Sequence, residues 1–413
     1  MRTLQLGYTD LMGTRFNGHD LHKQLLLRGI ESQNCVLKKD SDDELTWKLA
    51  DGKARRLISG VASLAENAMS IQSLLYPFSW QLPFNRRFRS ADLVHYHLIH
   101  SGYFSIASFP WLTHLKPSVW TLHDPWALTG HCVHPFSCEK WKTGCGKCPD
   151  LNTLFPIRRD TTAGMWRMKK FLYKHSPVDI VLASKWMLKL AQASPLLAEH
   201  RLHLIPFGID LNKFKPMDNE DAKQRLGIFP GSIVVTFRAV EGEFKGLSFI
   251  KECLRKLEVK QPVCLLTFNV RGLADEFRGK YQIIDLGWVN DDALTVQAYN
   301  ASDVFLMPSM GEAFGMMAIE AMACGKPVIT FEGTALPEVT FAPEGGVAVP
   351  KGDAAALCAE LENLINNPDA RRQIGEQALA LAREHYDVNT HVDRILALYT
   401  DVIARRKAGI NGR

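Results

Sequence analysis

Short apolar runs alternate with amphipathic segments along most of the chain. Runs of strand type include LQLGY, ADLVHYH and SVWTLHD in the first half, and SIVVTF, VCLLTF and DVFLMPS in the second. Amphipathic stretches such as NGHDLHKQLLLRG and GLSFIKECLRKLE separate such runs, and the first of these ends at Gly29, a residue type that often follows a helix. A repeated strand-then-helix order predicts parallel sheets with right-handed crossovers, buried on both faces. We therefore predict an α/β protein.

The alternation pauses at IPFGIDLNKFKPMDNED, where prolines, a glycine and a charged run indicate a connection between domains. A chain of 413 residues also exceeds the size at which one hydrophobic core keeps growing. We predict two doubly wound, Rossmann-like domains, residues 1–206 and 216–385, joined by a linker at 207–215. Ligands bind beyond the carboxyl ends of such strands, so two facing domains would enclose a cleft. The amphipathic segment 386–413 is predicted to pack back across the domain junction.

Composition places the chain among ordinary water-soluble globular proteins, with 46% hydrophobic and 23% charged residues. No apolar run approaches the roughly 18 to 20 residues that a membrane span requires. The first residues, MRTLQLGYTD, lack the pattern of a signal peptide. We expect a cytoplasmic protein.

Charge is distributed unevenly. Residues 1–205 contain 26 Lys and Arg against 16 Asp and Glu, a net +10, whereas the remainder contains 23 against 28, a net −5. One basic cluster, Arg86-Arg87-Phe88-Arg89, lies close to Trp80 and Phe84. Such clusters either form solvated faces or dock the first domain on an anionic membrane surface, here the inner membrane. No nucleic-acid-binding motif accompanies them, so we expect no nucleic acid partner.

The segment PSMGEAFGMMAIEAMACGKPVI, residues 308–329, carries the most specific chemistry. Its pattern predicts a strand end, a loop of small residues and a helix start, and a helix N-terminus suits a phosphate group. Glu312 and Glu320 bracket Phe314-Gly315-Met316-Met317. Because carboxylates do not bind phosphate, they would face hydroxyl groups of a sugar or a ribose. The combination indicates a nucleotide sugar.

These motifs resemble those of retaining family 4 glycosyltransferases, which have the GT-B fold. The resemblance covers nearly the whole chain and rests on the E-x7-E pair Glu312 and Glu320, the following EAMACGKPVI, the IPFGID linker and ASDVFLMPS. It implies transfer of a hexosyl group from a nucleoside diphosphate sugar, a UDP- or GDP-hexose, with retention at the anomeric carbon. It also implies departure and attack on one face of the sugar, without an agreed carboxylate nucleophile.

The resemblance assigns roles in the second domain. Glu320 would accept hydrogen bonds from the ribose, Glu312 would lie near hydroxyls of the donor sugar, and the N–H groups of residues 314–317 would meet sugar or phosphate oxygens. Lys245 matches the family's phosphate lysine and would stabilise the diphosphate leaving group. Arg238 would share that task, although FRAVEGEFKG is longer between Arg and Lys than usual and lacks the usual preceding glycine. No DxD motif stands out, so these cations would replace a catalytic metal ion.

In the first domain the resemblance singles out WTLHD, which ends a predicted strand. His123 matches a family histidine that touches the donor sugar, and Asp124 follows it. Asn17-Gly18 stands where the family has a glycine-rich loop, and would let the backbone approach the donor phosphate or the acceptor. His95 and His97 also end a strand and could line the acceptor side.

A cysteine-rich segment lies in GHCVHPFSCEKWKTGCGKCP. It contains four thiols, those of Cys132, Cys138, Cys145 and Cys148. Thiols this close in a cytoplasmic protein favour a structural Zn²⁺ site, in which His131 or His134 could replace one cysteine. Because the first spacing of five residues is unusual for zinc, disulfides or unligated thiols are the alternatives. A closed site would fix the insertion 131–149 beside His123.

Similar cysteine segments occur in bacterial transferases that build surface polysaccharides of colanic acid, capsule or O-antigen type. The resemblance therefore implies a glycan or polyprenyl-diphosphate-linked acceptor. Two other interpretations remain. One is a sugar phosphorylase or nucleotide-sugar epimerase with the same fold, and the other is a non-catalytic, zinc-stabilised binding module.

Overall fold

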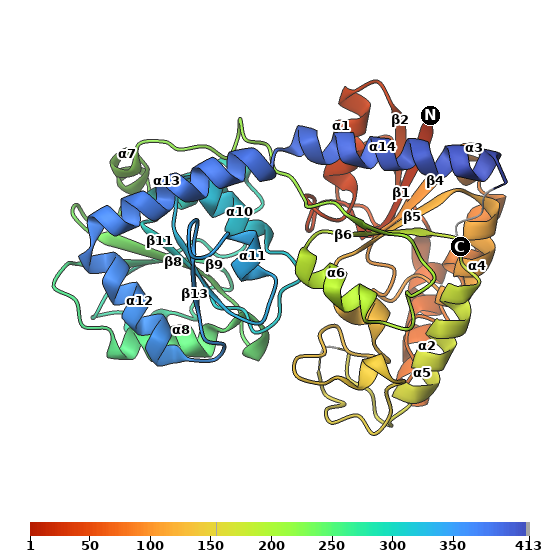
Figure 1. Ribbon diagram of the computed structural model, residues 1–413, viewed down its shortest axis with the longest axis horizontal. Coiled ribbons are helices and arrows are strands. Elements are labelled where there is room, and N and C mark those ends of the chain that lie inside the picture. The colour runs from red at the N-terminus through yellow and green to blue at the C-terminus, as the bar shows by residue number, and fades with distance from the viewer. Residues whose placement is uncertain (154, 410–413) are drawn as a thin grey trace. The chain divides into compact units, whose positions relative to one another are not determined.

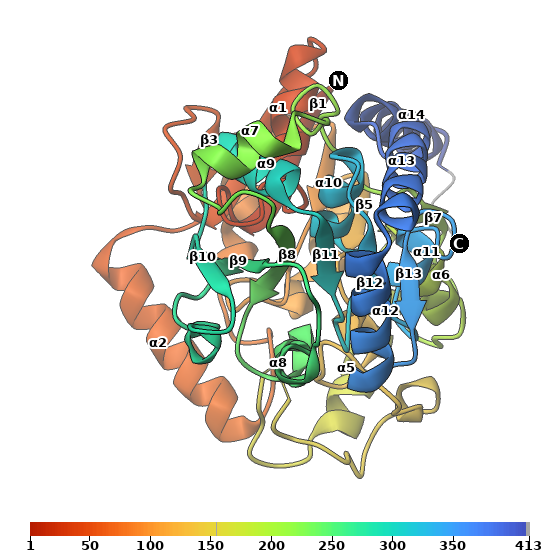
Figure 2. The same cartoon turned by 90° about the vertical axis from the view of Figure 1, so that its left-hand side faces the viewer.

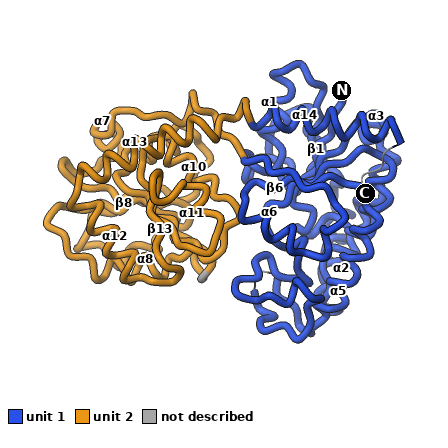
Figure 3. The backbone as a smooth tube through the Cα atoms, in the orientation of Figure 1, with its two compact units in different colours: residues 1–206, 391–413 blue, residues 207–390 orange. Residues whose placement is uncertain are grey.

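The computed structural model describes residues 1–153 and 155–409, which form two compact units (Figure 3). Unit 1 comprises residues 1–206 and 391–413, and unit 2 comprises residues 207–390. The residues predicted as a linker, 207–215, thus fall in unit 2. Most of the last helix, α14 (Val388–Lys407), belongs to unit 1. Among the described residues, no helix combines the length and apolar character needed to cross a membrane.

Unit 1 is built around a seven-stranded parallel sheet in the order β3-β2-β1-β4-β5-β6-β7 (Figure 1). Its strands are β1 (Arg2–Thr9), β2 (Glu31–Lys38), β3 (Thr46–Lys48), β4 (Leu93–Tyr96), β5 (Ser118–Leu122), β6 (Asp179–Leu182) and β7 (Leu202–Leu204). Its helices, besides α14, are α1 (His19–Leu27), α2 (Gly52–Met69), α3 (Arg86–Ser90), α4 (Phe109–Leu115), α5 (Thr162–Lys174) and α6 (Lys185–Gln192). The inner strands β4, β5 and β6 are buried throughout, which accounts for their continuous apolar runs.

Unit 2 contains a six-stranded parallel sheet in the order β10-β9-β8-β11-β12-β13. Its strands are β8 (Ile233–Ala239), β9 (Val263–Asn269), β10 (Gln282–Asp285), β11 (Val304–Met307), β12 (Val328–Phe331) and β13 (Val347–Val349). Its helices are α7 (Asn219–Arg225), α8 (Leu247–Lys256), α9 (Asp292–Ala301), α10 (Met316–Ala323), α11 (Leu336–Val339), α12 (Ala354–Asn366) and α13 (Pro368–His385). Figure 2 shows α8 and α12 on one side of this sheet and α7, α9 and α10 on the other.

Each sheet reverses its strand order beside its first strand. In unit 1 the chain runs from β1 outward through β2 and β3, and then returns to place β4 on the other side of β1. In unit 2, β8 has β9 on one side and β11 on the other. Loops that leave such a pair of strands diverge to opposite faces, so a crevice opens at the carboxyl ends. This architecture confirms the predicted doubly wound α/β class.

Two glycines inside helices differ in their surroundings: Gly375 is closely packed, whereas Gly60 is not. Gly375 in α13 lies so close to the chain after α10 that an added Cβ would stand 2.3 Å from the Gly325 carbonyl oxygen. Gly60 in α2 has no neighbouring atom within 4 Å of an added Cβ. We predict that Gly60→Ala stabilises the protein by about 0.5–1 kcal/mol through the helix preference alone. Gly375→Ala should instead destabilise it by about 1–3 kcal/mol, because the helices must separate.

Thermal unfolding of both variants beside the wild-type chain measures the difference. Shifts of the same sign in the two melting temperatures would contradict the packing role of Gly375.

Candidate functional site

In unit 2 a cationic and an anionic side chain meet at the carboxyl ends of β8 and β11. Lys245 Nζ donates a hydrogen bond to Glu312 Oε2 at 2.6 Å, and both side chains are largely buried. Arg238 near the end of β8 is also partly buried, and its Nη2 donates to Asn269 Oδ1 at 3.4 Å. Burial lowers the pKa of Arg238, opposed by the charge of Glu312. The structure therefore brings together three of the four residues predicted as catalytic.

A close backbone approach between the loops after β8 and β11 fixes the positions of Lys245 and Glu312. Gly246, directly after Lys245, has φ +74°, and an added Cβ would lie 1.9 Å from the Pro308 carbonyl oxygen. The Met310 N–H donates to the Phe244 carbonyl at 3.0 Å. The loop after β8 is thus fixed against the loop after β11, and only glycine fits at the contact.

The predicted phosphate-binding helix start is present at α10. Gly315 precedes the helix with φ +110°, and its added Cβ would meet Leu336 Cδ2 at 2.5 Å. Met316 and Met317 form the first helical positions, whose N–H groups lack intrahelical acceptors. The Phe314 ring is buried and packs edge-on against Phe207 and Tyr386. Its side chain therefore anchors the loop, and only its backbone is suited to a ligand.

Glu320 is almost fully buried, with 2% of its surface exposed. Its Oε2 accepts a hydrogen bond from the Tyr299 hydroxyl at 2.8 Å. A carboxylate held this way cannot rotate freely, so its remaining acceptor capacity has a fixed direction. Tyr299 thus orients one of the predicted site residues, and the sequence did not reveal this role because nothing in its own helix pattern distinguishes it from a core aromatic.

The site residues predicted in the first domain lie in unit 1, at the carboxyl ends of β1, β4 and β5. His123 follows β5, and its Nε2 lies 3.3 Å from Nδ1 of His97, which follows β4. His95 Nε2 lies 2.7 Å from Thr121 Oγ1, and His95 Nδ1 lies 2.6 Å from the Tyr399 hydroxyl. Both ring nitrogens of His95, and both of His97, are bonded within the unit. The two histidines therefore orient other groups, contrary to the expectation that they line an acceptor surface.

Asn17 and Gly18 have structural roles at the loop after β1. The Asn17 amide donates to the carbonyl oxygens of Thr9, Asp10 and Met12 at 2.8–2.9 Å. Gly18 has φ +96°, and an added Cβ would lie 2.7 Å from the His97 ring. The hydrogen bonds of the Asn17 amide are thus already made, so any contact with the sugar donor here would come from the backbone.

Asp124 has its own partners beside His123. It accepts from the Trp126 N–H at 2.9 Å and pairs with His100 Nε2 at 3.1 Å. Burial raises the pKa of Asp124, but His100 and the backbone donor outweigh burial and leave it below its ordinary value. Asp124 thereby fixes the start of the turn at Pro125–Leu128.

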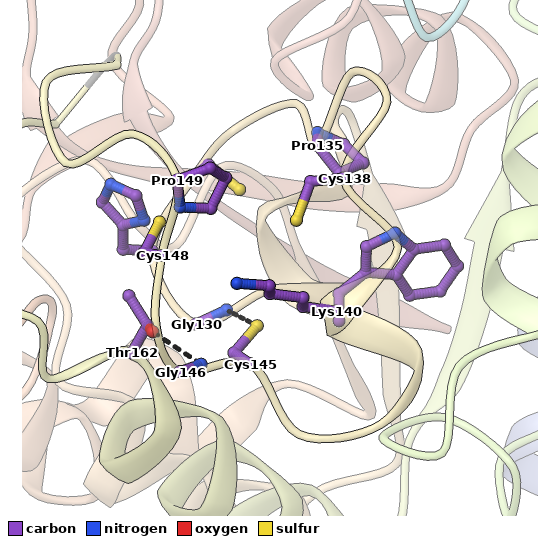
Figure 4. A pocket seen from close by; sticks show the side chains of 12 residues that line it. Gly130, Pro135, Cys138, Lys140, Cys145, Gly146, Cys148, Pro149 and Thr162 are labelled. Atoms are coloured by element: carbon purple, nitrogen blue, oxygen red, sulfur yellow. Dashed lines mark hydrogen bonds between the residues drawn. The ribbon is translucent and has the colours of Figure 1, made fainter.

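The four cysteines of the predicted zinc segment line one pocket of unit 1 (Figure 4). The Cys145 sulfur accepts a hydrogen bond from the Gly130 N–H at 3.3 Å, and Cys148 Sγ lies 3.0 Å from the Asp150 carbonyl oxygen. All four are free of disulfides. Within the described ranges, however, no group of three or more His, Cys, Asp or Glu side chains is arranged to hold a metal ion. The pocket gathers suitable ligands without closing them around one point, so zinc stays a prediction.

A buried lysine lies beneath this segment. Lys169 in α5 has no exposed surface, and its Nζ donates to the carbonyl oxygens of Trp126 and Thr129 at 2.6 and 2.9 Å. The ammonium also lies 3.3 Å from the centre of the Trp126 ring. Burial lowers the pKa of Lys169 to about 7, opposed by the nearby Cys132 and Cys145. Lys169 thus ties the loop that follows His123 to α5.

The sequence and the fold agree with comparisons to known proteins. Residues 218–380 match the family described as "Glycosyl transferases group 1". The two units have the GT-B fold, and the chain resembles glycosyltransferases of bacterial surface polysaccharides. One relative is WcaC of Escherichia coli (strain K12), named as a colanic acid biosynthesis glycosyl transferase. It is 25% identical over 282 residues, which are 64% of this chain and 65% of that protein.

Solved structures extend the likeness in fold over nearly the whole chain. The sucrose-phosphate synthase of Thermosynechococcus elongatus has a TM-score of 0.69 at 18% identity, covering 98% of this chain and all of that one. Anabaena Alr3699/HepE, solved with UDP and glucose, has a TM-score of 0.65 at 16% identity, covering 97% and 99%. In sequence, however, the chain spans only about half to two thirds of the length of the curated relatives it matches.

Metal content of the purified native chain tests the zinc prediction. If the four thiols close around zinc, we expect about one zinc per chain, and the double variant Cys145→Ser/Cys148→Ser should lose it and melt at a lower temperature. Cys358→Ser, which changes a buried thiol in α12 of unit 2, should keep the metal. Zinc near zero in the native chain, with unchanged melting after chelation, would exclude the site.

Proposed function

We propose that this protein is a retaining hexosyltransferase. It would move a hexosyl group from a nucleoside diphosphate sugar to a glycan or polyprenyl-diphosphate-linked acceptor during synthesis of a bacterial cell-surface polysaccharide. The observation that carries the proposal is the pair of Lys245 and Glu312 at the carboxyl ends of β8 and β11, next to the start of α10. The family match over 218–380 and the neighbour solved with UDP and glucose support it.

The cations would act on the leaving group. As the glycosidic bond breaks, negative charge develops on the nucleoside diphosphate, and a cation already in position stabilises that charge. Lys245 presents an ammonium held by Glu312 at 2.6 Å, and Arg238 presents a partly buried guanidinium that donates to Asn269 at 3.4 Å. Phosphate oxygens would also meet the free N–H groups at the start of α10, where the helix dipole favours an anion.

The carboxylates would act on hydroxyl groups. Glu312 holds Lys245 in the structure, and a bound diphosphate would compete for that ammonium and release the carboxylate toward the sugar. Glu320, oriented by Tyr299, would accept from the ribose. The released Glu312 would then contact the sugar and the fixed Glu320 the ribose, which explains why the two carboxylates bracket an anion site.

Lys245→Ala tests the proposal in the full-length chain. Loss of one preorganised hydrogen-bond donor to a developing negative charge typically costs about 10²- to 10³-fold in rate. We expect the rate of sugar transfer to fall by at least that factor while the melting temperature stays close to that of the wild type. Lys251→Ala is the matched control. Lys251 lies in the neighbouring helix α8, outside the candidate site, and pairs with Glu276 at 2.8 Å.

Screening UDP- and GDP-hexoses, with and without a lipid-linked acceptor, provides the assay. Full activity in Lys245→Ala would refute the assignment. Nucleotide-sugar conversion that needs no acceptor would favour an epimerase instead.

We further propose that unit 1 docks on the cytoplasmic face of the inner membrane through an anionic lipid surface. Trp80, Phe84 and Trp111 form an exposed aromatic cluster, with Trp80 and Trp111 stacked at 5.9 Å. The exposed Arg86 and Arg89 follow directly in the chain. Aromatic side chains favour the membrane interface, and arginines favour anionic head groups.

Cosedimentation with lipid vesicles tests the docking surface. Each arginine near an anionic surface contributes about 1 kcal/mol, so Arg86→Gln/Arg89→Gln should weaken binding roughly 30-fold. The vesicles should contain phosphatidylglycerol, with pure phosphatidylcholine as the neutral comparison. Lys256→Gln/Lys260→Gln removes two exposed lysines from unit 2 and should bind like the wild type. Equal binding to both vesicle types would contradict the proposal.

A further inference from the structure

A buried amide joins two hydrogen-bonded groups in unit 1. Gln5 lies in the middle of β1 with no exposed surface. Its Nε2 lies 3.2 Å from the Tyr399 hydroxyl, and its Oε1 lies 3.1 Å from His97 Nε2. Tyr399 belongs to α14, so this one side chain connects the last helix to the ends of the central strands.

The network continues from both ends of the amide. On one side, the Tyr399 hydroxyl lies 2.6 Å from His95 Nδ1, and His95 Nε2 lies 2.7 Å from Thr121 Oγ1. On the other side, His97 Nδ1 lies 3.3 Å from His123 Nε2. The His95 and His97 rings are 4.2 Å apart between centroids. Six side chains thus form one continuous chain of hydrogen bonds.

The three histidines of the network are uncharged at neutral pH. Burial lowers the pKa of His95 and of His97 well below the ordinary value, and burial lowers that of His123 to about 3. A neutral imidazole has one N–H donor and one bare acceptor nitrogen. Each neutral ring that donates at one nitrogen must therefore accept at the other, so all hydrogen bonds along the chain point the same way.

The orientation of Gln5 then determines every donor in the chain. Its carbonyl oxygen can only accept, so His97 must carry its proton on Nε2 and accept at Nδ1. His123 must consequently donate from Nε2 to His97. On the other side, the Gln5 amino group donates to Tyr399, whose hydroxyl donates to His95 Nδ1, so His95 carries its proton on Nε2. A flipped amide would reverse all of these bonds and place all three protons on Nδ1.

We propose that Gln5 and Tyr399 are positioning residues that hold His123 as a neutral imidazole with its proton on Nε2. This inference rests on the proposed function only for its consequence in catalysis. In this state His123 is an uncharged ring whose Nδ1 is the acceptor nitrogen. It would orient a sugar hydroxyl and would not deliver a proton as a general acid.

The same network explains the glycine after Asn17. An added Cβ at Gly18 would lie 2.7 Å from the His97 ring. His97 therefore has a glycine on one side and His123 on the other, and it has little freedom to rotate away from Gln5. The orienting role of the network depends on this close packing.

Nitrogen-15 NMR of the histidine side chains tests the inference without substrate. In full-length protein labelled at histidine, we expect His95, His97 and His123 each to show an N–H signature at Nε2 and a bare nitrogen at Nδ1. The signals should not titrate between pH 8 and 5. Protons on Nδ1, or a mixture of the two forms, would overturn the proposal in the wild-type chain itself.

Two substitutions at Gln5 distinguish the effect of its hydrogen-bond acceptor from the effect of its packing. Gln5→Leu removes the acceptor for His97, so His123 should become a mixture of the Nε2-protonated and Nδ1-protonated tautomers. Because the sugar hydroxyl is then less well oriented, kcat for transfer should fall roughly tenfold or more. Gln5→Glu keeps an acceptor toward His97 and should restore the Nε2 proton on His123, while the proton on His95 moves to Nδ1. Unchanged His123 signals in a folded Gln5→Leu chain would contradict the role of the amide.

The readouts distinguish this inference from the proposed function. If the NMR signatures follow the prediction but no sugar donor is consumed, the positioning network stands and the proposed transfer is wrong. If transfer is observed but His123 carries its proton on Nδ1, the proposed transfer stands and the network assignment is wrong.

Discussion

Parallel sheets that are covered on both faces favour functional polar groups at their carboxyl ends, and most of the candidate site residues in both units lie there, with Gln5 in the middle of β1 as a buried exception. In unit 2 the carboxyl ends of β8 and β11 bring together Arg238, Lys245 and Glu312. In unit 1 the buried histidine network lies at and below the carboxyl ends of β1, β4 and β5. The contact between Gly246 and Pro308 and that between Gly18 and His97 serve the same purpose. In each, a missing side chain lets two loops approach closely enough to hold functional groups.

Much of this could be predicted from the sequence, because it depends on local patterns. Alternating strands and helices predict the doubly wound class, which the structure confirms. The spacing of Glu312 and Glu320 around a helix start places Glu312 in the loop before α10 and Glu320 within α10. Lys245 was assigned by resemblance, and the structure sets it 2.6 Å from Glu312 although 67 residues separate them.

The rest depends on contacts between distant positions, which no local pattern records. Gln5 and Tyr399 are 394 residues apart, and each alone resembles an ordinary polar residue in a strand or a helix. The sequence also suggested that His95 and His97 face an acceptor, whereas their ring nitrogens are bonded inside the unit. The burial of Lys169 could not be predicted either, because its partners are backbone carbonyls.

The central claim is that the carboxyl end of the unit 2 sheet binds a nucleoside diphosphate through a positioned cation. Calorimetric titration of the full-length chain with UDP and UMP, and with GDP and GMP, tests it most directly. The account predicts that one diphosphate binds at least tenfold more tightly than its monophosphate, and that Lys245→Ala removes most of this difference while the monophosphate still binds. Equal affinities in the wild type, or a difference that survives Lys245→Ala, would contradict it.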